Sequence, residues 1–377
     1  MSLLTLWAIL SFALVGCGVG AGEPAGELGD GDSPETTEAN RRMSVQDLVG
    51  QMFVVSVGGT EPDYYVEKMV RERNIGGVIL FGPNMESEEQ TRGFVSSLQG
   101  LAMRTGPAVP LFVAVDHEGG VVQHASWVTP QPSAAEIGAR GNPAEARRVS
   151  EKIGRELRRA GVNTDLAPVV DTGTGAAVGS RSYGSDPKLV AAMGAAAVEG
   201  FEVAGVVSAA KHFPNHGPAT EDSHVGRPVI GHDAQTLADL DLPPFRAAVE
   251  AGAPMVMAGH LVYPAIDPDR PASLSPAAVR LLREELGFDG VIVTDDLAMD
   301  GARRGGTVAG AAVAAVGAGA DLLIVSSPPE EQAAAYDAVV AAVESGEIPR
   351  GRVEESAGRI MRVKERYSRY MGSIALM

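Results

Sequence analysis

The sequence contains one cysteine, few aromatic residues and fewer basic than acidic side chains. A single Cys in 377 residues excludes an intramolecular disulfide and a zinc site built on cysteines. Aromatic residues make up 5% of the chain and glycine numbers 46, which favours helices packed closely on strands over an aromatic-rich β-sandwich. The formal net charge of −17 repels phosphate backbones and argues against nucleic acid as a partner. Hydrophobic residues, at 45%, are sufficient for a sizeable core.

An apolar run at residues 3–16 is too short for a comfortable membrane span and has the length of a signal peptide. It ends at Cys17 in the sequence LVGC, which resembles the lipobox of bacterial lipoproteins, where the cysteine receives a lipid. The alternative is that the chain begins with an apolar segment that is not a signal peptide. The absence of Lys or Arg before the run favours this alternative, because secretory signal peptides normally have a basic residue there. We expect residues 1–17 to be a lipoprotein signal peptide and the polar residues 18–43 to be a disordered tether. The protein would then be lipid-anchored on the extracytoplasmic face of the cell membrane.

From residue 44 onward, short apolar runs alternate with longer helical patterns. The candidate strands are 52–57, 77–81, 110–115, 165–170, 206–210, 254–258, 290–294 and 321–325. Helical patterns include 63–73, 87–104, 143–160, 187–204, 275–286 and 329–345. Continuous apolar runs indicate strands buried on both faces, as in a parallel sheet. About eight strand–helix units in ~320 residues predict a single (β/α)8 barrel over 44–370. A doubly wound sheet is the alternative, but no G-x-G-x-x-G opens the first helix.

Polar side chains follow four of the predicted strands at the points where the strands end. These segments are 116–120 (DHEGG), 211–217 (KHFPNHG), 259–260 (GH) and 294–296 (TDD). The chemistry of a (β/α)8 barrel lies at the carboxyl ends of its strands, and charged groups there cost desolvation. We therefore expect these side chains to form a functional site.

Some of these residues also have structural interpretations. Asp116 or Asp295, taken alone, could cap the helix that follows it. His212 and His216 have the spacing of a metal pair, but the proline between them breaks any helix and no H-E-x-x-H is present. We therefore expect no metal site.

The polar segment 220–224 (TEDSH) follows a Gly-Pro pair and is expected to be a loop. Its default interpretation is a solvated loop. Asp222 and His224 are two residues apart, however, and can form a hydrogen-bonded dyad in which the carboxylate orients the imidazole and raises its basicity.

The segment 211–217 (KHFPNHG) followed by 222–224 (DSH) resembles the signature of bacterial β-N-acetylhexosaminidases of glycoside hydrolase family 3. The resemblance covers roughly residues 45–330, and the DSH loop separates this branch from the β-glucosidases of the family. It is also carried by 115–120 (VDHEGG), 167–171 (APVVD), 181–187 (RSYGSDP), 259–265 (GHLVYPA) and 286–299 (LGFDGVIVTDDLAM).

The resemblance implies a role for each candidate residue. Asp295 matches the catalytic nucleophile, and Asp222 with His224 matches the acid/base dyad. The residues that match ligands of the sugar in the −1 site are Asp116, Arg181, Lys211 and His212.

The sequence departs from the family pattern at three positions. Val121 and His124 stand where the family usually has arginines, the second of which contacts sugar. We expect His124 to bind substrate with one hydrogen bond in place of a guanidinium fork. Asn215 stands where the family usually has glycine, and we expect it to adopt a positive φ.

The resemblance implies a retaining exo-β-N-acetylglucosaminidase that acts on peptidoglycan or chitin fragments without a cofactor. Retention needs a carboxylate nucleophile and a proton donor on opposite faces of the sugar, and His can give and take a proton near neutrality. If His224 is not the donor, Glu118 and Glu221 are the next candidates. One alternative function is a phosphorylase, because a neutral His does not repel phosphate. The other is a non-catalytic sugar-binding lipoprotein, which would be expected to lack the nucleophile or the dyad.

Overall fold

Eight parallel strands form one sheet in the computed structural model, in the order β10-β1-β2-β3-β6-β7-β8-β9. A further parallel bridge between Val293 and Leu322 joins β9 to β10, so the sheet closes on itself. The strands are β1 (Phe53–Ser56), β2 (Gly77–Ile79), β3 (Phe112–Val115), β6 (Thr164–Asp165), β7 (Val207–Phe213), β8 (Met255–Ala258), β9 (Val291–Thr294) and β10 (Leu323–Val325). The predicted (β/α)8 barrel is thereby confirmed.

The structure describes residues 43–303 and 305–371. The predicted signal peptide with Cys17, and the predicted tether up to residue 42, lie outside these residues. None of the helices that the structure describes combines the length and the hydropathy needed to cross a bilayer.

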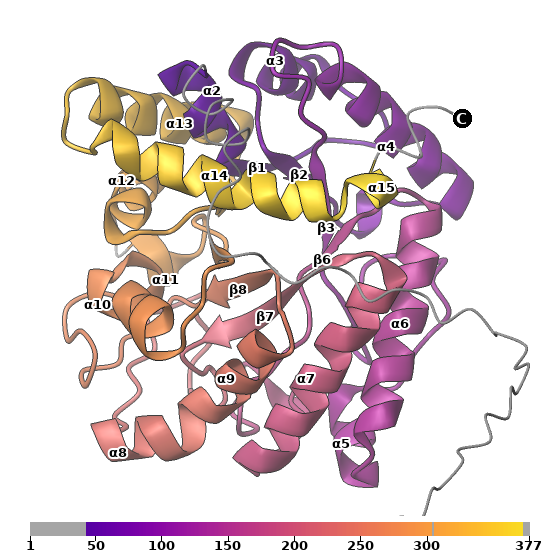
Figure 1. Ribbon diagram of the computed structural model, residues 1–377, viewed down its shortest axis with the longest axis vertical. Helices are drawn as coiled ribbons and strands as arrows, with labels where there is room; N and C mark the ends of the chain where they lie inside the picture. The colour runs from indigo at the N-terminus through magenta and orange to yellow at the C-terminus, as the bar shows by residue number, and fades with distance from the viewer. Residues whose placement is uncertain (1–42, 304, 372–377) are drawn as a thin grey trace, which may run out of the picture.

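Helices surround the strands (Figure 1). The principal ones are α3 (Tyr64–Arg73), α4 (Glu88–Ala102), α6 (Pro143–Arg159), α7 (Pro187–Ala204), α9 (Leu242–Glu250), α10 (Pro276–Arg280), α12 (Val308–Ala318), α13 (Pro329–Glu344) and α14 (Arg350–Arg366). Several of these helices are preceded by a residue with a short polar side chain. Such a side chain accepts a hydrogen bond from a free backbone N–H group in the first turn of the helix. Asp63 caps α3 through the amide of Val66 at 2.8 Å, and Asp186 caps α7 ahead of Pro187.

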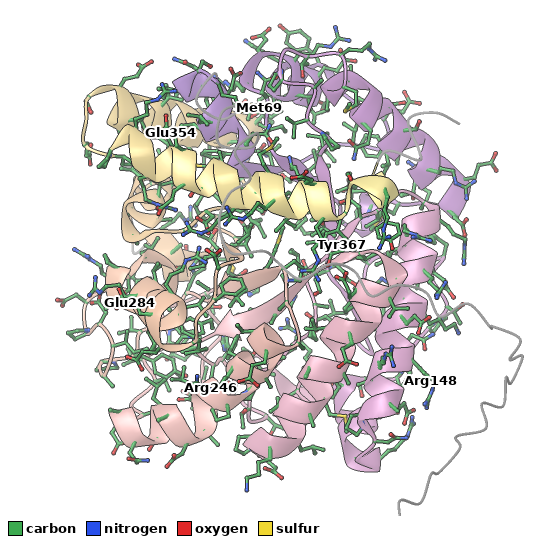
Figure 2. The ribbon with its side chains drawn as sticks, in the orientation of Figure 1. Met69, Arg148, Arg246, Glu284, Glu354 and Tyr367 are labelled. Atoms are coloured by element: carbon green, nitrogen blue, oxygen red, sulfur yellow. The ribbon has the colours of Figure 1, made fainter. Side chains whose placement is uncertain are left out.

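The core lies inside the barrel and between the strands and the helices. Every residue of β3, β7, β8 and β9 is buried, as expected for strands covered on both faces, and β7 extends beyond the predicted apolar run to include Lys211 and His212. Figure 2 shows the side chains around this core. Met69 and Tyr367 are each 1% exposed, whereas Arg148, Arg246 and Glu284 are exposed on the outer helices.

The predicted strand 165–170 is only partly formed. Regular pairing is confined to Thr164 and Asp165, and an isolated bridge joins Val169 to Lys211 further along. Between them lies Pro168, which has no N–H to donate to a neighbouring strand.

Helix α14 lies across the amino-terminal ends of the strands, in front of them in Figure 1. Its Lys364 is 3% exposed and donates hydrogen bonds to Gln51 Oε1 at 2.8 Å and to the Gly76 carbonyl at 2.9 Å. The ammonium also lies 4.8 Å from the centroid of the Phe112 ring. This helix therefore covers the base of the barrel, opposite the carboxyl ends of the strands.

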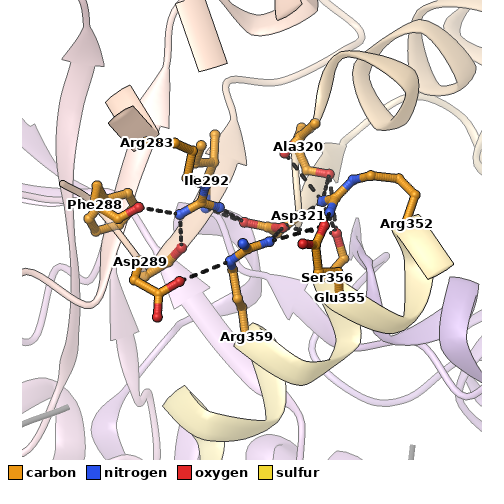
Figure 3. A network of polar contacts seen from close by, with 12 residues as sticks. Arg283, Phe288, Asp289, Ile292, Ala320, Asp321, Arg352, Glu355, Ser356 and Arg359 are labelled. Atoms are coloured by element: carbon orange, nitrogen blue, oxygen red, sulfur yellow. Dashed lines mark hydrogen bonds and ion pairs between the residues drawn. The ribbon is translucent and has the colours of Figure 1, made fainter. Parts of the chain in front are cut away.

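A buried carboxylate fastens α14 to this base (Figure 3). Asp321, which precedes β10, is fully buried and lies within ion-pair distance of Arg283, Arg352 and Arg359. It also accepts the backbone N–H of Ile292 at 2.9 Å. Burial acts to raise the pKa of Asp321, but the three guanidinium groups more than offset it and hold the pKa below its usual range. The group is therefore ionised at neutral pH and joins α14 to β9 and β10.

The buried Lys364 should make the stability of the barrel depend on pH. Burial lowers the pKa of its amine from 10.5 to about 7, so above pH ~10.5 the amine is neutral in both folded and unfolded chains. As pH falls from there toward 7, the unfolded chain takes up a proton that the folded chain does not, and stability declines. The loss is at most roughly 5 kcal/mol, since one pKa unit corresponds to about 1.4 kcal/mol.

We expect this pH dependence to be smaller in Lys364→Met. Denaturant unfolding between pH 7 and 10 would measure it, with the exposed Lys188→Met as the matched control. Equal slopes of unfolding free energy against pH in wild type and Lys364→Met would contradict the prediction.

Candidate active site

A cavity of about 350 Å³ lies at the carboxyl ends of the strands. Its volume is at the lower end of the range for small-molecule sites. It brings together all eight residues that the sequence suggested for catalysis or sugar binding: Asp116, His124, Arg181, Lys211, His212, Asp222, His224 and Asp295.

A buried group of charges forms one wall of the cavity. Glu118 accepts two hydrogen bonds from Arg181, at 2.7 and 2.8 Å, and lies 2.8 Å from Lys211 Nζ. Lys211 also pairs with Asp116. The side chain of Lys211 is 2% exposed and that of Glu118 is 6% exposed. These contacts hold Arg181 and Lys211 in fixed positions beside the cavity.

Glu118 is the residue of this wall whose role was least evident from the sequence. Burial acts to raise its pKa, but Lys211 and Arg181 more than offset burial and lower the pKa to about 2. Glu118 is therefore ionised at neutral pH, and it is unsuitable as a proton donor. This geometry does not support the expectation that Glu118 could replace His224 as the proton donor. Its position two residues after Asp116 was the only sequence signal for its place in the wall.

His212 and His216 form the floor of the cavity beside this wall, and the buried Asp171, which is not among the lining residues, holds them in place. Asp171 Oδ2 lies 2.7 Å from His212 Nδ1, and its Oδ1 accepts the backbone N–H groups of His212 and His216 at 3.1 and 2.6 Å. Asp171 is fully buried. Burial acts to raise its pKa, and the two histidines more than offset it, so the pKa lies below its usual range. The fixed carboxylate keeps the Nδ1 proton on His212 and turns Nε2 away from Asp171.

The loop of Asp222 and His224 has a buried centre and exposed flanks. Ser223 is 2% exposed, and its hydroxyl lies 3.0 Å from His216 Nε2. On either side, the side chains of Asp222 and His224 are 49% and 69% exposed. His224 Nδ1 lies 2.7 Å from Asp222 Oδ1, which also accepts the His224 backbone N–H at 3.0 Å. The predicted hydrogen-bonded dyad is therefore present, and the contact of Ser223 ties its loop to the floor of the cavity.

Two adjacent carboxylates, Asp295 and Asp296, follow β9, and their surroundings differ. Asp296 accepts the backbone N–H groups of Ala298 and Ser326, each at 3.0 Å, and the hydroxyl of Ser326. Asp295 accepts only the backbone N–H of Asp296, at 2.8 Å, among the hydrogen bonds of the described residues. Burial acts to raise the pKa of Asp295, but His260, His212 and other neighbours lower it below its usual range. Asp295 is thus an ionised carboxylate with lone pairs available to the cavity.

Residues 44–363 match the family model described as "Glycosyl hydrolase family 3 N terminal domain". The chain belongs to glycoside hydrolase family 3. The match covers the barrel from α2 (Val45–Gln51) nearly to the end of α14, and so includes every residue of the cavity described above.

Three similar proteins have names that describe β-hexosaminidases or β-N-acetylglucosaminidases. The chain is 32% identical over 338 residues to "Beta-hexosaminidase A" of Pseudoalteromonas piscicida, covering 82% of this chain and 56% of that protein. A solved family 3 β-N-acetylglucosaminidase from Paenibacillus sp. str. FPU-7 is 39% identical with a TM-score of 0.84, over 86% of this chain and 63% of that one. A β-N-acetylhexosaminidase from Beutenbergia cavernae is 33% identical with a TM-score of 0.79, over 86% and 99%. The chain thus spans little more than half of the first relative.

Asn215 has a different role in this family 3 chain from the one expected. Its φ is not positive, so that expectation is wrong; Asn74 and Ala108 are the non-glycine residues with positive φ in the described ranges. The buried Asn215 amide instead bonds both backbone groups of Thr172, at 2.9 and 3.0 Å, and Asp241 Oδ1 at 2.7 Å. The side chain therefore joins its own loop to the segment at Thr172 and to Asp241 at the end of the helical segment Leu237–Asp241.

Of the other two departures from the family pattern, one lies at the cavity wall and the other does not. His124 lines the cavity, and its ring meets that of Phe81 edge-on with centroids 5.8 Å apart. Val121 is 77% exposed and is not among the lining residues. The wall of this family 3 barrel therefore has an aromatic pair at His124 in place of a guanidinium group.

In the described part of the chain, no group of three or more His, Cys, Asp or Glu side chains is arranged to hold a metal ion. His212 and His216 are neighbours, with ring centroids 5.6 Å apart, but their hydrogen bonds go to Asp171 and Ser223. These partners account for the spacing that resembled a metal pair.

Proposed function

We propose that the protein is a retaining exo-β-N-acetylglucosaminidase that hydrolyses terminal β-linked N-acetylglucosamine from peptidoglycan or chitin fragments. The observation that carries the proposal is that the Asp295 carboxylate, which accepts a single hydrogen bond from the described residues, and the Asp222–His224 dyad line the same cavity. The printed names of the β-hexosaminidase and β-N-acetylglucosaminidase relatives support the same substrate class.

In the first step, Asp295 attacks the anomeric carbon and the bond to the leaving sugar breaks. The leaving oxygen needs a proton, which His224 supplies from Nε2 while Asp222 holds Nδ1. A covalent sugar–Asp295 ester remains. In the second step, neutral His224 takes a proton from water, which attacks the same carbon and releases Asp295. Two inversions give net retention.

The other residues of the cavity position the sugar in this proposal. Lys211 and Asp116 are placed to bind hydroxyl groups, and Arg181 is held beside them by Glu118. His212 presents Nε2 with its tautomer fixed by Asp171. His124 adds a single donor or acceptor at the wall.

Hydrolysis of an aryl N-acetyl-β-glucosaminide, followed by NMR of the first-formed sugar, tests the proposal. Release of the β-anomer supports it, and the absence of turnover on aryl and oligosaccharide substrates would contradict it. Repeating the reaction in phosphate buffer distinguishes a hydrolase from a phosphorylase, because a phosphorylase would yield the sugar 1-phosphate. A non-catalytic sugar-binding lipoprotein is disfavoured by the presence of Asp295, Asp222 and His224 together.

We also propose that the mature protein is lipid-anchored through Cys17 on the extracytoplasmic face of the cell membrane. The support is the apolar run that ends at the only cysteine of the chain, followed by polar residues. Cys17→Ala should move the protein from the membrane fraction to the soluble fraction after cell lysis. A variant that stays with the membranes would contradict the anchor, and a Ser2→Ala variant is the matched control within the same segment.

A further inference from the structure

The side chain of Asn215 is fully buried and uses all of its hydrogen-bonding capacity. Its Nδ2 donates to the Thr172 carbonyl at 3.0 Å and to Asp241 Oδ1 at 2.7 Å. Its Oδ1 accepts the backbone N–H groups of Thr172 and Gly217, at 2.9 and 2.8 Å. A side-chain amide has two N–H donors and two acceptor lone pairs, so all four are filled. Asn215 thus takes the place of strand pairing between the segments that follow β6 and β7.

Asp241 and His232 continue these contacts toward the protein surface. Asp241 is fully buried, and its Oδ2 lies 2.8 Å from His232 Nδ1. The ring of His232 meets that of the buried Tyr263 edge-on, with centroids 6.4 Å apart, and the Tyr263 hydroxyl donates to the Asn215 carbonyl at 2.5 Å. The side chain of His232 is 23% exposed. The series His232–Asp241–Asn215 therefore runs from the surface to the loop after β7.

The inner end of this series adjoins the floor of the cavity. Asn215 directly precedes His216, whose backbone N–H donates to Asp171 Oδ1 at 2.6 Å. Thr172, which Asn215 bonds through both of its backbone groups, directly follows Asp171. Asp171 in turn fixes the tautomer of His212, because its Oδ2 lies 2.7 Å from Nδ1 of that ring. A shift of the Asn215 side chain would therefore move Asp171 relative to both histidines of the floor.

The same floor also supports the loop of Asp222 and His224. The hydroxyl of Ser223, which is buried between these two residues, lies 3.0 Å from His216 Nε2. The position of His216 is thus passed on to the loop that carries the dyad.

We propose that Asn215, Asp241 and His232 are positioning residues, which hold the floor of the cavity where it supports both the sugar and the loop of the dyad. This inference rests on the proposed glycosidase function. None of the three side chains lines the cavity, so they act through the residues that they hold. The glycine that the family usually has at position 215 could not make these four hydrogen bonds. Misplacement of a catalytic group by about 1 Å can cost roughly 100-fold in rate.

Variants along the series test the contacts one at a time. Asn215→Ala and Asn215→Gly should each lower kcat/KM on an aryl N-acetylglucosaminide by about 10- to 100-fold, measured well below the unfolding temperature. Asp241→Ala should lower it similarly, because Asn215 Nδ2 and the His232 ring lose their common partner. In Asp241→Asn the amide can accept from Asn215 and donate to His232, so most of the activity should return. His232→Asn should likewise exceed His232→Ala, because its Nδ2 can take the place of Nδ1.

Gln51→Ala is the matched control for lost stability. Gln51 is buried at the opposite end of the barrel, where it bonds the Asn74 carbonyl and Lys364. Its replacement should lower the unfolding temperature and leave kcat/KM at the wild-type value.

The positioning also has a readout that needs no substrate. The Nδ1 proton of His212, held against Asp171, should give a downfield NMR signal in protein with isotope-labelled histidine. We expect this signal to move or broaden in Asn215→Ala and in Asp241→Ala. It should stay in place in Asp241→Asn and in Gln51→Ala, because these variants leave the contacts of Asn215 intact.

Wild-type kcat/KM in Asn215→Ala or Asn215→Gly would overturn the proposal, as would equal losses in Asp241→Asn and Asp241→Ala. An unchanged His212 signal in folded Asn215→Ala would overturn it whatever the activity. If the Asn215 variants do not fold, His232→Ala and His232→Asn at the half-buried outer end decide, and equal wild-type kcat/KM in both would overturn the proposal. Failure of the proposed function is distinct, because the wild-type protein would then turn over no substrate while the NMR comparison would still apply.

Discussion

Replacing Asp295 with asparagine should abolish turnover and leave the barrel folded, with kcat reduced on the order of 10⁴-fold or more. The carboxylate ends a fully buried strand, carries a lowered pKa and receives only one backbone hydrogen bond from the described residues. A neutral amide cannot form the ester intermediate. Steady-state kinetics on an aryl N-acetylglucosaminide and thermal unfolding would be measured together.

Asp296→Asn is the matched control, because Asp296 contacts Ser326 and backbone amides instead of remaining available. Asp296→Asn should lower the unfolding temperature clearly, because these hydrogen bonds weaken, and should reduce kcat far less than Asp295→Asn does. In Asp295→Ala, added azide should restore some turnover and give the α-glycosyl azide, since one displacement inverts the anomeric carbon. A covalent sugar found on Asp296 of the wild-type protein would move the nucleophile by one residue. Substantial activity in both Asp295→Asn and Asp295→Ala would show that Asp295 is not the catalytic nucleophile.

Replacing His224 with alanine should reduce activity about 10²–10⁴-fold on substrates with poor leaving groups. An oligosaccharide or methylumbelliferyl group needs protonation as it departs, whereas a dinitrophenyl group scarcely does. The loss should therefore shrink toward the dinitrophenyl substrate. Asp222→Ala should show a weaker form of the same pattern, because it removes the partner 2.7 Å from His224 Nδ1 and leaves the imidazole in place.

Val225→Ala controls for disturbance of the same loop, because this neighbouring side chain is 78% exposed and lies outside the cavity lining. Its activity should depend on the leaving group as in wild type. An equal loss on all leaving groups in His224→Ala, expressed mainly in KM, would reject the acid/base role. Glu221, which is exposed on the same loop, would then be the next candidate.

The sequence was sufficient to predict the barrel and the eight candidate residues that its cavity brings together, because both depend on local order along the chain. Most of the strands lie in short apolar runs, and the residues near the carboxyl end of a strand lie at one end of the barrel whatever the details of packing. The pairing of those residues was less accessible. Glu118 and Arg181 are 63 positions apart, and only the folded loops show that they share two hydrogen bonds.

Asn215 illustrates the same limit. Its identity suggested a backbone conformation, whereas its role depends on Thr172 and Asp241, which are 43 and 26 positions away. Asp171 could have been suspected from its place after a predicted strand. Its two histidine partners, however, come from β7 and the loop that follows, and their distance from Asp171 is set by the closure of the barrel.

The position of α14 at the base of the barrel affects the order in which the domain can fold. Lys364 bonds Gln51, which lies 313 positions earlier, and Arg350 bonds the Met43 carbonyl, 307 positions earlier. During synthesis, β1 through β10 emerge before the helix that covers their starting ends. Contacts so distant in sequence form slowly, because a long loop must close before they can contribute stability. The barrel is therefore expected to reach its final packing only after α14 has left the ribosome.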